Sequence, residues 1–130
     1  MTTGLVRLKT RADFLRVAAR RSRAARRGFV LQVAPAPSGT EASVRVGFTA
    51  SRKVGNAVIR NRAKRRLRAA AAEILRQRGQ PGSDYVLIAR AGGTVSQPYA
   101  ELVGDLAGAL RQLERQATSG EARVQRGKEG

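Results

Sequence analysis

The densest cluster of chemically useful side chains lies between Ser51 and Arg68. This span holds eight basic residues and no acid: Arg52, Lys53, Arg60, Arg62, Lys64, Arg65, Arg66 and Arg68. Like charges four residues apart on a helix repel each other, as Arg60 and Lys64 would. A polyanion would relieve that repulsion, and the backbone N–H groups at a helix entry after Gly55 could receive a phosphate. The span therefore predicts a nucleic-acid contact, with a solvated basic helix face as the alternative.

The charge of the chain is concentrated in its first half. The 130 residues carry 26 Lys and Arg against 9 Asp and Glu, a formal net charge of +17. Residues 1–68 hold 18 of the bases and only Asp13 and Glu41 as acids, whereas residues 69–130 hold 8 bases and 7 acids. A local field of this size attracts polyanions through counterion release. Nucleic acid is the expected partner, and anionic lipid is the alternative.

The residue types used in most protein-based catalysis are missing. The chain has no Cys and no His, which removes disulfides, thiolate nucleophiles and the usual zinc sites. Its nine acids are scattered singly, whereas two-metal hydrolysis of phosphodiesters uses clustered carboxylates. We therefore expect no catalytic residue. No apolar run approaches the roughly 20 residues of a membrane span, and the first residues do not resemble a signal peptide, so we expect a cytoplasmic protein without a membrane partner.

Residue patterns predict three helices and three strands. Thr10 and Asp13 form a capping box for a helix over about residues 11–20. Apolar or alternating runs predict strands over 29–34, 44–49 and 85–89, and a further short strand could lie near 50–54. Residues 57–78 lack Gly and Pro and carry an apolar stripe, and a second stripe begins at Tyr99. Both stripes predict amphipathic helices.

This element order predicts an α/β sandwich, with about three helices mainly covering one face of a small sheet. On the second strand, Val44, Val46 and Phe48 share one face, and Arg45 and Thr49 lie on the other. A single domain is expected over residues 1–116. From about residue 117 the sequence is small and charged without aliphatic periodicity, so residues 117–130 are expected to form a disordered tail.

The segment from Lys53 to Arg65, centred on Arg60-Asn61-Arg62, resembles the signature block of the bacterial ribonuclease P protein subunit. Other blocks agree with that family in order and spacing: Arg7-Leu8-Lys9, Asp13-Phe14, Phe29-Val30-Leu31, Arg45-Val46-Gly47-Phe48 and Tyr85 to Arg90. The resemblance covers about residues 5–115. It implies a two-layer α/β sandwich with a left-handed βαβ crossover, a fold shared with domains of ribosomal proteins. It also implies a protein that assists a catalytic RNA in removing the 5′ leader from precursor tRNA.

The resemblance further implies which side chains meet RNA. Those expected to contact the RNA subunit lie on the long helix and at its entry: Arg52, Lys53, Asn56, Arg60, Asn61, Arg62, Lys64, Arg65, Arg66 and Arg68. Those expected to line a cleft for the leader are Phe14, Val17, Val30, Gln32, Arg45, Thr49 and Arg90. Ala18 stands where the family commonly has an aromatic residue, and Gln32 where it commonly has Tyr. Phe14 could stack on a leader base or pack in the core, and the sequence leaves both open.

Two RNA partners are implied, the ribonuclease P RNA and precursor tRNA, with no obligate protein partner. Mg²⁺ is expected to serve the assembled enzyme from sites made mainly by RNA, with none bound by the protein alone, and protein metal ligands cannot be named. A ribosomal or ribosome-assembly protein is the main alternative, because it would share the basicity and size. A stand-alone protein nuclease is the other.

Overall fold

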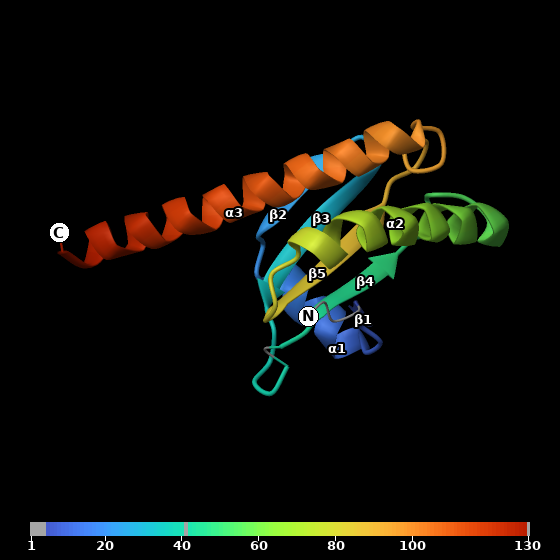
Figure 1. Cartoon of the computed structure of the whole chain (residues 1–130). Coiled ribbons are helices and arrows are strands. Elements are labelled where there is room, and N and C mark those ends of the chain that lie inside the picture. Colours follow the sequence, from blue (N-terminus) through green and yellow to red (C-terminus); the bar gives the residue numbers. More distant parts are fainter. Residues whose placement is uncertain (1–4, 41, 130) are drawn as a thin grey trace.

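The centre of the molecule is a five-stranded sheet. The computed structural model describes residues 5–40 and 42–129. The strands are β1 (Val6–Arg7), β2 (Arg23–Arg26), β3 (Phe29–Pro35), β4 (Val44–Thr49) and β5 (Ser83–Ala89). Their order across the sheet is β1-β4-β5-β3-β2 (Figure 1). The pairs β1·β4 and β4·β5 are parallel, and β5·β3 and β3·β2 are antiparallel.

Three helices complete the fold: α1 (Arg11–Ala19), α2 (Ala57–Arg78) and α3 (Tyr99–Glu129). Helix α2 connects the parallel neighbours β4 and β5 and is therefore the crossover helix of a βαβ unit, which the family resemblance implied. The mixed α/β class is confirmed. The left-handed sense of the crossover stays a prediction.

The helices divide between the two faces of the sheet because side chains alternate along each strand. Helices α2 and α3 cover one face and form the main core with it. The largest buried side chains there include Phe29, Leu31, Leu67, Leu75, Tyr85, Leu87, Leu102 and Leu106. Helix α1 packs on the opposite face, where Val17 joins Leu8, Ala34 and Val86 in a smaller cluster. The expectation that helices mainly cover one face therefore holds for α2 and α3, while α1 adds cover to the other.

Most predicted elements appear with boundaries within two residues. The two strands that the sequence did not predict, β1 and β2, are short and lie at the sheet edges, where pairing and not apolar alternation defines them. The possible strand near residues 50–54 is absent, because the backbone of Ser51 and Arg52 accepts turn hydrogen bonds from Val54 at 3.0 Å and Gly55 at 3.2 Å. This turn leads from the end of β4 directly into α2.

The backbone of α3 is helical as far as Glu129, whereas the sequence predicted disorder from about residue 117. The last part of the helix extends beyond the sheet (Figure 1). In the part of the chain that the structure describes, no helix combines the length and apolarity needed to cross a bilayer.

Candidate nucleic-acid interface

The basic helix α2 begins at a well-formed N-terminal cap. Gly55 has a φ of 151°, which side chains rarely adopt, and a Cβ there would lie 2.9 Å from Ile59 atoms. The Asn56 side chain accepts a hydrogen bond from the backbone N–H of Ile59 at 3.0 Å. Asn56, predicted to contact RNA, therefore has its side-chain oxygen engaged in capping, and one N–H expected to receive phosphate already has a partner. The first turn of α2 contains no acid that would offset its positive dipole end.

Helix α2 and its entry carry a continuous set of unpaired cations. Seven of the eight bases between Ser51 and Arg68, all except Arg66, form what we call the cationic surface: Arg52, Lys53, Arg60, Arg62, Lys64, Arg65 and Arg68. None of these side chains has an ion-pair or hydrogen-bond partner among the described residues, where the salt bridges join only Arg16 and Arg45 to Asp13 and Asp84. The acids of the described residues therefore leave this charge unneutralised. Asn61 is exposed among these cations.

One stripe of the cationic surface is partly enclosed. Arg60, Lys64 and Arg68 follow one another at intervals of four residues and are each half-buried. The Nε atoms of Arg60 and Arg68 are buried, and neither has an acceptor among the described residues. A buried donor without an acceptor costs about 1–3 kcal/mol. An acceptor such as a phosphate oxygen would remove that cost.

Arg66, also predicted to contact RNA, does not belong to this surface, because its guanidinium donates to the protein's own backbone. Its half-buried guanidinium turns to the loop between β5 and α3. Its Nε donates to the carbonyl of Thr94 at 2.9 Å, and its Nη2 donates to the carbonyl of Gln97. The physical reason is that the Thr94 and Gln97 carbonyls lie beside Arg66 and accept hydrogen bonds from two of its five N–H donors.

The predicted leader residues share the face of the sheet that carries α1, which we call the α1-side face. Strand register arranges this face in three rows: Ala34–Asp84–Arg45, Gln32–Val86–Gly47 and Val30–Ile88–Thr49. Val30, Gln32, Arg45 and Thr49 are thus brought together from two strands that are not adjacent, with β5 between them. Helix α1 adds Phe14 and Val17.

Two side chains of the first row, Asp84 and Arg45, are held in a network of ion pairs. Asp84 is fully buried and pairs with Arg16 of α1 and with Arg45 Nε at 3.2 Å. Arg45 Nη2 also lies 3.0 Å from Asp13 Oδ2. The pKa of Asp13 is lowered mainly because the Thr10 hydroxyl donates to its carboxylate at 2.8 Å, with further help from Arg16 and Arg45. Arg45, also predicted to line the cleft, is neutralised by these two acids, and its ion pair with Asp13 fastens α1 to the sheet.

The middle row carries the α1 side chains. Val17, predicted to line the cleft, is fully buried and supports α1 on the sheet. Phe14 is half-buried and lies over Gly47, where a Cβ would come within 2.5 Å of the ring. The absence of a side chain at Gly47 is what lets the Phe14 ring reach the strand. One part of the ring therefore packs against the protein, and the rest is accessible.

The third row is the more open part of the α1-side face. Val30, Ile88 and Thr49 are each half-buried. Arg90 follows β5 on the same side and is exposed, and its Nη1 donates to the carbonyl of Arg26 at 2.9 Å. This face therefore offers a mixed apolar and polar strip with a cation at its end.

A hollow of about 400 Å³ adjoins this strip and is lined by Ala18, Arg21, Arg23 and Gln32. The Gln32 side chain, predicted to line the cleft, is buried at its floor. Arg21 has a φ of 62°, an unusual conformation for a residue with a side chain. The sequence analysis missed Arg21 and Arg23, although their run of arginines between the first helix and the first long strand was a usable signal.

The carboxylates of the α1-side face do not suit a divalent cation, because Asp13 and Asp84 are already paired with arginines. Within residues 5–40 and 42–117, acids are not gathered in threes or more as a metal site would need. The expectation that Mg²⁺ is held mainly by RNA stays a prediction.

The fold and these two surfaces define a basic α/β protein suited to binding a polyanion. Comparison with known proteins supplies the family. The sequence model described as Ribonuclease P matches residues 4–114. The chain is 53% identical over 116 residues to the ribonuclease P protein component of Paramagnetospirillum magneticum, covering 87% of this chain and 86% of the relative. It is 49% identical over 112 residues to that of Ruegeria pomeroyi, covering 86% and 89%.

Solved structures agree with the sequence relatives. A Staphylococcus aureus RNase P protein mutant with defective mRNA degradation activity is similar with a TM-score of 0.68 and 27% identity, over 83% of this chain and 87% of that chain. The RNase P protein from Thermotoga maritima is similar with a TM-score of 0.62 and 26% identity, over 84% and 96%. The chain belongs to the ribonuclease P protein component family and is thus a subunit of a tRNA-processing ribonuclease.

Proposed function

We propose that this chain serves ribonuclease P by binding two RNAs, the RNA subunit through the cationic surface and the 5′ leader of precursor tRNA across the α1-side face. The observation that carries the proposal is the cationic surface, in which neighbouring bases on α2 lack any ion pair among the described residues. Such a surface is electrostatically unfavourable alone and favourable against closely spaced phosphates. Arginine suits this role because its guanidinium can donate two parallel hydrogen bonds to two oxygens of one phosphate.

The α1-side face suits a single strand of variable sequence. The accessible part of Phe14 can stack on a base, which contributes about 1–3 kcal/mol without strong base preference. Arg90 at one end of the open strip and Arg21 and Arg23 around the hollow supply positive charge for the backbone of the strand. Ala18 and Gln32 place no aromatic ring in the hollow. Cations therefore contribute more to leader binding here than stacking on any ring other than Phe14.

The protein's contribution to the reaction is binding and not bond breaking. Mg²⁺ held by RNA phosphates would activate the water and stabilise charge in the transition state. The cations of this chain reduce the repulsion between two polyanions, the RNA subunit and its substrate. Less Mg²⁺ is then needed to bring them together.

The deciding experiment adds the protein to a transcribed ribonuclease P RNA at a Mg²⁺ concentration too low for the RNA to act alone, and measures release of the leader. We expect the protein to restore cleavage and the RNA-free protein to cleave nothing. The double variant Arg62→Ala/Arg65→Ala should restore less than Arg76→Ala/Arg115→Ala, which removes the same charge from exposed positions elsewhere. No stimulation by the unmodified protein would refute the proposal. Co-purification with ribosomal RNA in place of one structured RNA would favour the ribosomal alternative.

A further inference from the structure

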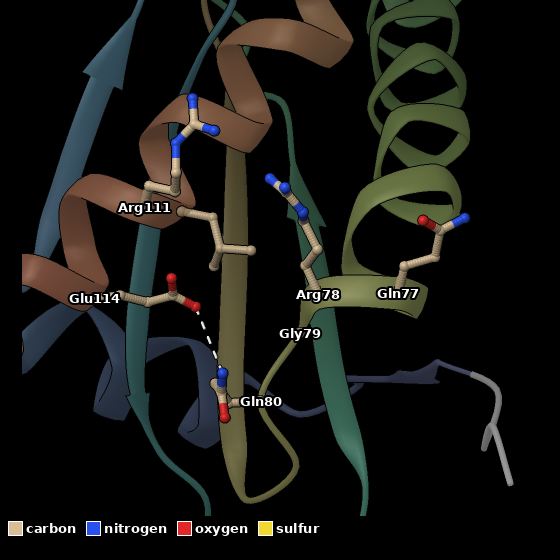
Figure 2. A pocket seen from close by; sticks show the side chains of 7 residues that line it. Gln77, Arg78, Gly79, Gln80, Arg111 and Glu114 are labelled. Carbon is tan, nitrogen blue, oxygen red and sulfur yellow. Dashed lines mark hydrogen bonds between the residues drawn. The ribbon is translucent and has the colours of Figure 1, made fainter.

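A second basic site lies away from both surfaces, between the C-terminal end of α2 and the middle of α3. A hollow of about 440 Å³ opens there. Its polar lining is Gln77, Arg78 and Gln80 from the end of α2 and the residues after it, with Arg111 and Glu114 from α3. In Figure 2 the Arg78 side chain extends from α2 towards α3, and Arg111 faces the same space from α3. Two guanidinium groups from different elements therefore border one hollow.

The charge around this hollow is not balanced within the described residues. Neither Arg78 nor Arg111 has an ion-pair or hydrogen-bond partner there. Glu114 is the one acid of the lining, and its Oε2 accepts a hydrogen bond from Gln80 Nε2 at 3.5 Å (Figure 2). Arg78 has a local reason to be basic, since it ends α2 and interacts favourably with the helix dipole. Arg111 lies in mid-helix and has no such reason.

The shape of the hollow is set by the protein itself. Leu110, which also lines it, is only 2% exposed. The Gly79 N–H donates to the Leu75 carbonyl at 2.8 Å, and the Gln80 N–H donates to the Tyr85 hydroxyl at 3.0 Å. The turn that carries Gln80 is therefore held in place before any ligand arrives, which reduces the entropy cost of binding.

We propose that this hollow binds a phosphodiester of the folded RNA subunit, as a contact separate from the cationic surface. The proposal rests on the proposed function, because it takes its ligand from the same RNA. Along α2, Arg78 is separated from Arg60 by 18 residues and from Arg68 by 10, which is about 27 Å and about 15 Å at 1.5 Å per residue. A phosphate bound at the cationic surface therefore does not also fill the hollow. A folded RNA with several helices presents phosphates at both, so α2 binds it at its two ends.

The first test compares two double variants that remove the same charge from the same two helices. Arg78→Ala/Arg111→Ala empties the hollow of its cations, and Arg76→Ala/Arg115→Ala removes exposed cations outside it. If each hollow arginine contacts a phosphate, the salt slope of binding to transcribed ribonuclease P RNA falls by nearly two. Between about 50 and 200 mM salt, the unmodified protein then loses about tenfold more affinity than the hollow variant. An equal fall in the control variant would overturn the proposal, because only long-range charge would be at work.

The second test attaches an iron chelate, which cleaves nearby RNA, to a single introduced cysteine. The chain has no Cys of its own, so only the introduced residue is labelled. We expect Gln77→Cys at the hollow to cleave a segment of the RNA different from the one cleaved from Val58→Cys, which is exposed at the start of α2. Cleavage from Val58→Cys alone would refute the second contact and leave the proposed function standing. Cleavage from neither position would contradict the proposed function itself.

Discussion

Arg65 and Arg66 are adjacent in sequence and chemically identical, but the structure gives them different roles. Arg65 is exposed and has no partner among the described residues, whereas Arg66 donates to the Thr94 and Gln97 carbonyls. We predict that Arg65→Ala weakens RNA binding without changing stability. Arg66→Ala should lower stability and leave the salt dependence of RNA binding nearly unchanged. Each variant is thus the control for the other, with the same loss of charge.

The expected magnitudes follow from these contacts. Loss of one phosphate contact by Arg65 lowers the salt slope by about 0.7–0.9. A hydrogen bond from a charged donor contributes about 1.5–3 kcal/mol, and because Arg66 is only half-buried we take about 2 kcal/mol for its pair of bonds together. With an unfolding entropy of about 2.1 cal/mol/K per residue, this loss lowers the Tm of a 130-residue chain by about 7 °C.

Both quantities can be measured on the same preparations. Binding to transcribed ribonuclease P RNA at several salt concentrations gives the slope, and thermal unfolding followed by circular dichroism gives the Tm. The reasoning would be refuted if Arg66→Ala lowered the slope as much as Arg65→Ala while keeping the Tm of the unmodified protein. That result would mean that the bonds from Arg66 to the loop do not persist and that its guanidinium faces RNA.

Three further predictions concern other parts of the molecule. Phe14→Ala should weaken binding of precursor tRNA by about 1–3 kcal/mol and leave binding of mature tRNA unaffected. The control is Leu15→Ala on the same helix, which should alter neither, because the Leu15 side chain is 55% exposed. Equal losses of binding for both tRNAs would favour the core role of Phe14. Asp84→Ala should destabilise the protein by about 3–5 kcal/mol in urea unfolding, because Arg16 and Arg45 lose their buried partner, and a loss below about 1 kcal/mol would contradict the ion-pair network. Partial burial and a hydrogen bond to the Glu73 carboxylate raise the pKa of Tyr99 to about 12. The stability that the protonated Tyr99 hydroxyl contributes is therefore present below pH 10 and is lost as pH rises from 10 towards 12. In ultraviolet titration, the difference between the native protein and Tyr99→Phe should show a tyrosine that ionises well above pH 10, and ionisation near pH 10 in a still-folded sample would be inconsistent with that contact.

Local patterns were sufficient for most element boundaries. The Thr10–Asp13 cap, the alternation of Val44, Val46 and Phe48 and the uninterrupted stripe of residues 57–78 each report a backbone conformation through neighbours a few residues away. The edge strand β1 was missed because its pairing partner β4 lies elsewhere in the chain, whereas β2 pairs with β3, the next strand along the chain. A sequence such as Arg-Ala-Ala-Arg has no pattern of its own that predicts a strand.

The sequence by itself determined that positive charge accumulates on and before one long helix, because helical spacing converts residue order directly into a surface. It also placed alternate residues of the central strands on opposite faces. Only the tertiary structure decided which of the basic side chains are available. Arg45 is neutralised by Asp84, 39 positions later in the sequence, and Arg66 is held by carbonyls about 30 residues away. The hollow between Arg78 and Arg111 likewise exists only because α3 packs beside α2. Such pairings depend on how distant segments meet in space, which the spacing of residues along one segment does not specify.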